Sequence, residues 1–160
     1  MSKYVLLKND GQVEMKELES ALDLKTMYKW IDCYCIDIAE SVISAKMGCK
    51  VMLIFDDEFL LNHNAPQANK IASLLFGYTV TTDECLCGNV IVAKEVVDEE
   101  GEPYFTAFDD EEIKKLNKLI DTCKGYSMFI KFKVQEPQYD VYTGLVRKKC
   151  TACKGLYTLF

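Results

Sequence analysis

The sequence lacks the features that would place it in several common classes. No apolar run approaches the ~20 residues that a membrane-spanning helix needs, and the opening MSKYVLLKNDG contains no long apolar signal segment. There is no P-loop, no G-x-G-x-x-G and no G-x-S-x-G motif. His63 is the single histidine, so any cysteine nucleophile would have only one imidazole as its base. We therefore expect a cytoplasmic protein that is not an enzyme.

The composition is that of one globular domain. The chain has 160 residues, of which 49% are hydrophobic and 28% charged, which suffices for a single core. The net charge of −6 disfavours bulk attraction to nucleic acid. The only basic cluster is RKKCTACK near the C-terminus, residues 147–154. We expect neither a membrane nor nucleic acid as the main partner.

Eight cysteines in a chain without a signal segment indicate reduced thiols rather than a disulfide framework. Three short motifs, C-x-C at 33–35, CLCG at 85–88 and CTACKG at 150–155, each resemble half of a zinc knuckle. Tetrahedral zinc needs four such ligands. CLCG and CTACKG would supply Cys85, Cys87, Cys150 and Cys153. We favour free or buried thiols and expect no cofactor, and we keep a structural zinc as the alternative.

The pattern of apolar residues predicts an α+β fold with a mostly antiparallel, mixed sheet in a single compact domain. Strands are expected over 4–7, 12–16, 49–55, 78–82, 88–97, 104–108, 126–134 and 139–146. About three helices are expected, over 17–31, 65–75 and 109–125, with Asn64 as the N-cap of the second and Gly125 ending the third. Residues 126–160 form a strand-rich C-terminal extension that carries the C-x-x-C motif.

The stretch FDDEFLLNH places Asp56, Asp57 and Glu58 close to His63. Carboxylates and an imidazole can hold a divalent metal or transfer protons. Adjacent acids on an extended segment point to opposite sides, however. We favour a solvated turn between a strand and a helix, and we keep a metal-dependent nucleotide hydrolase as an alternative.

A second candidate site is the start of the expected helix over 65–75, whose unpaired amides could bind an anion. It would use Asn64, Asn69 and Lys70, and the aromatic residues Tyr28, Trp30 and Tyr34 could stack on a base. The alternative is that the aromatic residues pack in the core on one helix face.

Three motifs, YKWIDCYCIDI, FDDE followed by NKIAS with Asn69 and Ala72, and CGNVIVAKEVVDEEGE, resemble the family named domain of unknown function 3846, which occurs in phages, plasmids and conjugative elements. The resemblance covers 28–97. One departure concerns a Gly-Gly pair that the family often has before its second strand, where this sequence has Asp32 and Cys33.

The resemblance implies an accessory protein of a phage or mobile element, without known enzymatic activity and acting in the host cytoplasm. We expect a non-catalytic protein that binds a small nucleotide-like signal or a host defence protein and so counters or modulates host defence. The alternative is a zinc-stabilised interaction module with a basic C-terminal tail that touches nucleic acid. Exposed strand edges make a homo-oligomer an expectation as well.

Overall fold

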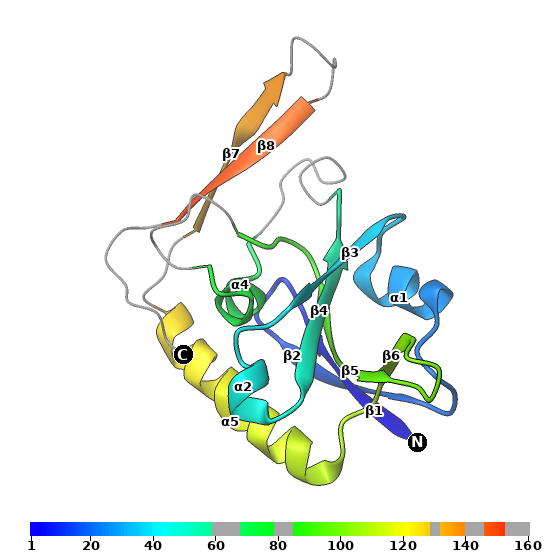
Figure 1. Ribbon diagram of the computed structural model, residues 1–160. Helices are drawn as coiled ribbons and strands as arrows, with labels where there is room; N and C mark the ends of the chain where they lie inside the picture. The colour runs from blue at the N-terminus through cyan, green and yellow to red at the C-terminus, as the bar shows by residue number, and fades with distance from the viewer. Residues whose placement is uncertain (59–67, 79–84, 129–131, 140–145, 153–160) are drawn as a thin grey trace.

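A six-stranded antiparallel sheet forms the centre of the chain (Figure 1). The computed structural model describes residues 1–58, 68–78 and 85–128 in full, and the backbone of 132–139 and 146–152. The strands are β1 Ser2–Leu7, β2 Val13–Leu18, β3 Ile36–Glu40, β4 Lys50–Asp56, β5 Val90–Val97 and β6 Pro103–Thr106. Their order is β2-β1-β5-β4-β3, and β6 also pairs with β5.

Strand β5 is the central element of the sheet. Its first residues, Val90, Ile91 and Val92, pair with β1, and Lys94 to Val97 pair with β6 along the same edge. Strand β4 pairs with the opposite edge of β5. Valine and isoleucine dominate β5, as suits a strand buried on both faces.

Helices cover both faces of the sheet (Figure 1). Helix α1, Leu24–Ile31, packs on one face, and α2 Ser44–Met47, α4 Lys70–Phe76 and α5 Asp110–Ser127 pack on the other. In β1, Tyr4 and Leu6 point to the α1 side and Val5 and Leu7 to the other side. Because successive strand residues alternate between faces, one sheet serves two hydrophobic cores. The predicted single compact α+β domain is confirmed.

The helix predicted over 17–31 is wrong in its first half. Residues up to Leu18 belong to β2, which pairs with β1 in a hairpin. The helix begins at Leu24 because Asp23 is its N-cap and accepts a hydrogen bond of 2.8 Å from the Thr26 amide. The short helix α2 was not predicted.

The two later helices also differ from the prediction at their ends. Helix α4 begins at Lys70 with Asn69 as its N-cap. The predicted cap, Asn64, lies outside the described residues. Helix α5 begins after Asp109, as predicted, but continues through Gly125 to Ser127. The expected strand over 126–134 therefore starts only at Phe132.

The C-terminal extension contains a separate two-stranded antiparallel sheet of β7 Phe132–Tyr139 and β8 Val146–Ala152 (Figure 1). These bounds replace the strands expected over 126–134 and 139–146. Of the strand expected over 78–82, the described part is Tyr78, which is not in a strand. Over the described ranges, no helix is both long and apolar enough to cross a membrane.

Candidate functional site

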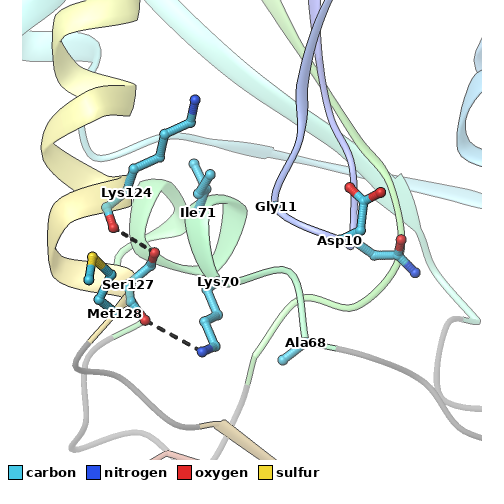
Figure 2. A pocket seen from close by; sticks show the side chains of 9 residues that line it. Asp10, Gly11, Ala68, Lys70, Ile71, Lys124, Ser127 and Met128 are labelled. Carbon is cyan, nitrogen blue, oxygen red and sulfur yellow. Dashed lines mark hydrogen bonds between the residues drawn. The ribbon is translucent and has the colours of Figure 1, made fainter.

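A pocket of about 310 Å³ lies between the β1–β2 turn, the start of α4 and the end of α5 (Figure 2). These three segments are far apart in the sequence and meet at one end of the sheet. The pocket is lined by Asn9, Asp10, Gly11, Ala68, Lys70, Ile71, Lys124, Ser127 and Met128. Its volume is at the lower end of the roughly 300–1,000 Å³ typical of small-molecule sites.

The β1–β2 turn is held in one conformation by its own hydrogen bonds. The Gly11 amide donates to the Lys8 carbonyl at 3.0 Å, and the Asp10 carboxylate accepts from the Gln12 amide at 2.9 Å. Gly11 has a φ of +89°, which a residue with a side chain rarely adopts. The Asn9 amide donates to the side chain of Asn89, just before β5. This wall of the pocket is therefore formed before any ligand arrives.

The start of α4 is fixed by Asn69, which is only 1% exposed. Its side-chain oxygen accepts from the Ala72 amide at 3.1 Å, and its amide nitrogen donates to the carbonyls of Leu7 and Gly88. These contacts use both N–H groups of the side chain and its oxygen. Asn69, a predicted ligand-binding residue, thus supports the pocket from behind and positions Lys70 beside it.

Lys70 and Lys124 place positive charge along the helical side of the pocket. The Lys70 ammonium lies 3.4 Å from the Ser127 carbonyl, and the Lys124 side chain is exposed. Within the described ranges, neither forms an ion pair. Figure 2 shows the two side chains leaving their helices in opposite directions, with Asp10 across the pocket. The pocket is therefore polarised, with two separate cationic side chains on its helical side and a carboxylate on the β1–β2 turn.

The predicted aromatic residues lie elsewhere. Tyr28 and Trp30 pack against the α1-side core, and the ring centroids of Trp30 and Tyr4 are 6.2 Å apart. Tyr34 follows α1 and is 89% exposed. Because α1 and α4 cover opposite faces of the sheet, the structure does not bring these rings to the pocket beside Lys70.

The acidic stretch after β4 forms a turn. Asp56 is buried at the end of the strand, and its carboxylate accepts from the Glu58 amide at 2.8 Å. Asp57 and Glu58 are exposed, and the Asp57 carboxylate lies 4.0 Å from the Cys35 thiol. His63 lies outside the described residues. In the part of the chain that the structure describes, no three histidine, cysteine or acidic side chains converge as metal ligands.

The four described cysteines outside the CLCG motif, Cys33, Cys35, Cys49 and Cys123, are poor nucleophiles at neutral pH. Burial raises the pKa of Cys123 to about 12. Burial, aided by the negative charge of Asp56, raises the pKa of Cys33 to about 11. Burial is also the main reason that the pKa values of Cys35 and Cys49 are raised. Since the thiolate is the reactive form, these four side chains remain thiols.

Of the predicted metal ligands, Cys85 and Cys87 lie together. Both are buried, and their sulfur atoms are 3.8 Å apart. Cys150 lies in β8, where the structure describes the backbone. Cys153 lies outside the described residues.

Sequence analysis did not identify Asp10 and Lys124 as pocket residues. The sequence indicated a turn at 9–11 and a helix that contains Lys124, but no local pattern shows that the turn and the helix meet. Lys70 was identified as a cation near the start of the helix expected over 65–75, whose predicted cap was Asn64.

These features define a small antiparallel α+β domain with a polarised, ligand-sized pocket at one end of its sheet. The chain belongs to the family described as Domain of unknown function (DUF3846), whose model matches residues 1–121. The match confirms the resemblance seen over 28–97 and extends beyond it on both sides. It ends within α5, so β7 and β8 lie outside it. No curated protein and no solved structure matches the chain.

Proposed function

We propose that this protein binds a small, nucleotide-like anion in the pocket between the β1–β2 turn, α4 and α5, and that it acts by binding rather than by catalysis. The observation that carries the proposal is the pair of lysines, Lys70 and Lys124, on the helical side of this pocket. Charge-assisted hydrogen bonds from ammonium groups to phosphate oxygens are about twice as strong as neutral ones. A phosphate group would therefore face α4 and α5.

The opposite wall favours a ligand that is not anionic throughout. Asp10 repels negative charge, and its carboxylate accepts hydrogen bonds from hydroxyl or amino groups. Asn9 adds an amide that can both donate and accept. A nucleotide meets both requirements, since it carries phosphate at one end and sugar hydroxyls and base amino groups at the other.

In the role that the family resemblance implies, the ligand is a nucleotide signal of host defence, and the protein sequesters it in the host cytoplasm. Sequestration needs affinity and no chemistry, which suits a pocket whose walls are fixed by hydrogen bonds before binding. The alternative partner is a host defence protein.

The first test is isothermal titration of the purified protein with AMP, cyclic di-AMP, adenosine and inorganic phosphate. At least one nucleotide should bind more tightly than adenosine or phosphate. The double variant Lys70→Gln/Lys124→Gln should weaken that binding by about tenfold or more, the equivalent of losing one charge-assisted hydrogen bond.

A matched control removes the same charge elsewhere. Lys29 and Lys118 are exposed on α1 and on α5, and neither lines the pocket. Lys29→Gln/Lys118→Gln should bind the nucleotide within about twofold of the wild type. Equal weakening in both double variants, or no nucleotide binding by the wild type, would overturn the proposal.

A further inference from the structure

Strand β2 forms one outer edge of the six-stranded sheet. It pairs with β1 on one side, and among the described residues its backbone bonds to no other segment. An edge strand of this kind presents a row of N–H and C=O groups with which a further strand can pair. The strand has 6 residues, and the side chain of Met15 within it is 41% exposed. The edge is therefore long enough and open enough to accept another strand.

The opposite edge of the sheet, strand β3, is protected against such pairing. The Ile38 amide donates a 2.8 Å hydrogen bond to the side-chain carboxylate of Asp37, so one donor of this edge is already used. The strand carries Asp37 and Glu40 but no lysine. A second copy that paired with β3 would bring like charges together, which destabilises a sheet. Of these two edges, β2 is therefore the one that suits a partner strand.

Strand β2 carries both signs of charge on one face. Glu14 and Lys16 are two residues apart and so point to the same side of the sheet. The Lys16 ammonium lies 2.7 Å from one carboxylate oxygen of Glu14, and the Lys8 ammonium lies 3.2 Å from the other. The side chains of Glu14 and Lys16 are 35% and 31% exposed. Both charges can therefore interact with a strand placed alongside.

The order of these charges is complementary to itself. In an antiparallel pair of identical strands, a two-fold axis perpendicular to the sheet places one residue opposite its own copy. With Met15 at the axis, Glu14 lies opposite Lys16 of the second copy, and Lys16 lies opposite Glu14 of that copy. An axis at Glu14 or at Lys16 would place like charges directly opposite each other. The charges thus favour a single symmetric register.

We propose that β2 pairs antiparallel with β2 of a second copy of this chain, with Met15 at the two-fold axis. The two sheets then join into one, and the cross-strand pair of Glu14 and Lys16 forms twice. The two Met15 side chains meet on the α4 and α5 side of the sheet, since Met15 pairs with Val5, which belongs to that core. Pairing of one short strand buries less than the ~1,200–2,000 Å² of a standard stable interface. The dimer therefore forms reversibly in the micromolar range, whatever the pocket binds.

The test is sedimentation equilibrium of the full chain between about 5 and about 500 μM, a span that covers micromolar dissociation constants. The wild type should pass from monomer to dimer over this range. Glu14→Lys and Lys16→Glu should each weaken the dimer by about tenfold or more, because each places like charges opposite in both cross-strand pairs. An equimolar mixture of these two variants should dimerise again, since opposite charges then face each other across the strands. A purely structural effect of either substitution would not be reversed by mixing.

Two control variants make the same changes of charge elsewhere. Glu40→Lys alters β3, and Lys25→Glu alters α1, both at exposed positions. Each should dimerise within about twofold of the wild type, because neither residue lies at the β2 edge. Hydrogen exchange at high and at low protein concentration should show slower exchange of β2 amides in the dimer, and unchanged exchange in β3.

Three outcomes would overturn the proposal. The first is a wild type that stays monomeric at about 500 μM, a concentration at which even a weak micromolar dimer would be formed. The second is a mixture of Glu14→Lys and Lys16→Glu that dimerises no better than either variant alone. The third is concentration-dependent protection of amides in β3 instead of β2.

Discussion

The side-chain amide of Asn69 donates a 3.0 Å hydrogen bond to the backbone carbonyl of Leu7, 62 residues earlier in the chain. The same amide group donates to Gly88 at 2.8 Å, and the side-chain oxygen caps α4 through the Ala72 amide. One buried side chain therefore joins the end of β1, the segment before β5 and the start of α4. The strength of this junction determines how firmly Lys70 is held at the pocket.

We expect Asn69→Ala to lower the free energy of unfolding by about 3 kcal/mol. About 1 kcal/mol comes from the lost N-cap, and the rest from two carbonyls left with fewer hydrogen bonds in a buried setting. Urea denaturation measures the change. Asp23→Ala is the matched control, because Asp23 caps α1 at an exposed site without further contacts of this kind and should cost only about 1 kcal/mol. An equal loss of unfolding free energy in the two variants would show that Asn69 contributes no more than a helix cap.

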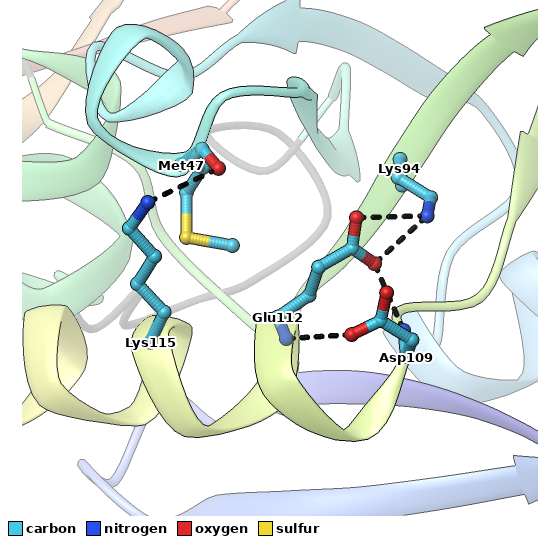
Figure 3. A network of polar contacts seen from close by, with 5 residues as sticks. All are labelled: Met47, Lys94, Asp109, Glu112 and Lys115. Carbon is cyan, nitrogen blue, oxygen red and sulfur yellow. Dashed lines mark hydrogen bonds and ion pairs between the residues drawn. The ribbon is translucent and has the colours of Figure 1, made fainter.

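Glu112 joins β5 to α5 through two sets of contacts (Figure 3). Its carboxylate accepts from the Asp109 amide at 2.8 Å, which completes a capping box, and pairs with the Lys94 ammonium at 2.8 Å. The side chains of Lys94 and Glu112 are only 17% and 21% exposed. This pair is less screened by solvent than an ordinary surface ion pair.

A double-mutant cycle with Lys94→Met and Glu112→Gln should therefore give a coupling energy of about 1 kcal/mol. Glutamine can still fill the capping box, so the cycle isolates the ion pair. Lys3 and Asp110 form a more exposed pair, and the cycle with Lys3→Met and Asp110→Asn should give a smaller coupling. A coupling near zero for Lys94 and Glu112 would show that desolvation cancels the attraction.

Stability should fall at alkaline pH because of Cys123. Burial raises the pKa of Cys123 from 9.0 to about 12, so the unfolded chain loses this proton first as the pH rises. The contribution of Cys123 is complete below about pH 9 and is lost between about pH 9 and about pH 12. One such group adds a slope of up to about 1.4 kcal/mol per pH unit.

Urea denaturation of the wild type and of Cys123→Ala at about pH 8 and about pH 10.5 measures this effect. The variant loses packing at both values, because the smaller side chain leaves a cavity in the core beneath α5. Its stability should nevertheless fall less steeply with pH. Parallel pH dependence in the two proteins would assign the alkaline loss to other groups, among them Tyr4, whose pKa is also raised by burial.

The sequence predicted those parts of the fold that local patterns control. The run of β-branched residues in β5 and the acids at the start of α5 both gave the correct element. The pattern around Leu18 gave the wrong element, because the spacing of Leu18 from later apolar residues also fits a helix. Its place in β2 depends on pairing with Ser2, across a hairpin, and a window of neighbouring residues does not contain that information.

The candidate site was predicted only in part, again because local sequence patterns do not show tertiary contacts. Asn69 and Lys70 were recognised from helix-start chemistry, whereas Asp10 and Lys124 join the pocket only through tertiary packing. Trp30 was expected beside them, yet it lies with α1 on the other face of the sheet. An apolar helix face reveals that a helix packs on a sheet, but not which side it covers.

Asp32 ends α1 in a left-handed conformation, with φ of +62°, and is the one non-glycine with positive φ among the described residues. Its amide donates to the Tyr28 carbonyl at 2.9 Å and so closes the helix. The family resemblance noted from the sequence implies a glycine at this place. Glycine would suit this backbone, because a residue without a side chain adopts a left-handed conformation at no steric cost.

Asp32→Gly should therefore keep or raise the free energy of unfolding, by up to about 1 kcal/mol, as the relief of left-handed strain offsets the greater freedom of the unfolded glycine. Asp32→Ala is the matched comparison, since it removes the same carboxylate but keeps a Cβ atom, and it should be less stable than Asp32→Gly by about 1 kcal/mol. Urea denaturation of the three proteins gives both differences. Nucleotide binding should be the same in all three, because α1 and the pocket lie on opposite sides of the sheet. Equal stability of the glycine and alanine variants would mean that the conformation costs nothing here, and the family's glycine would then need a reason other than the backbone.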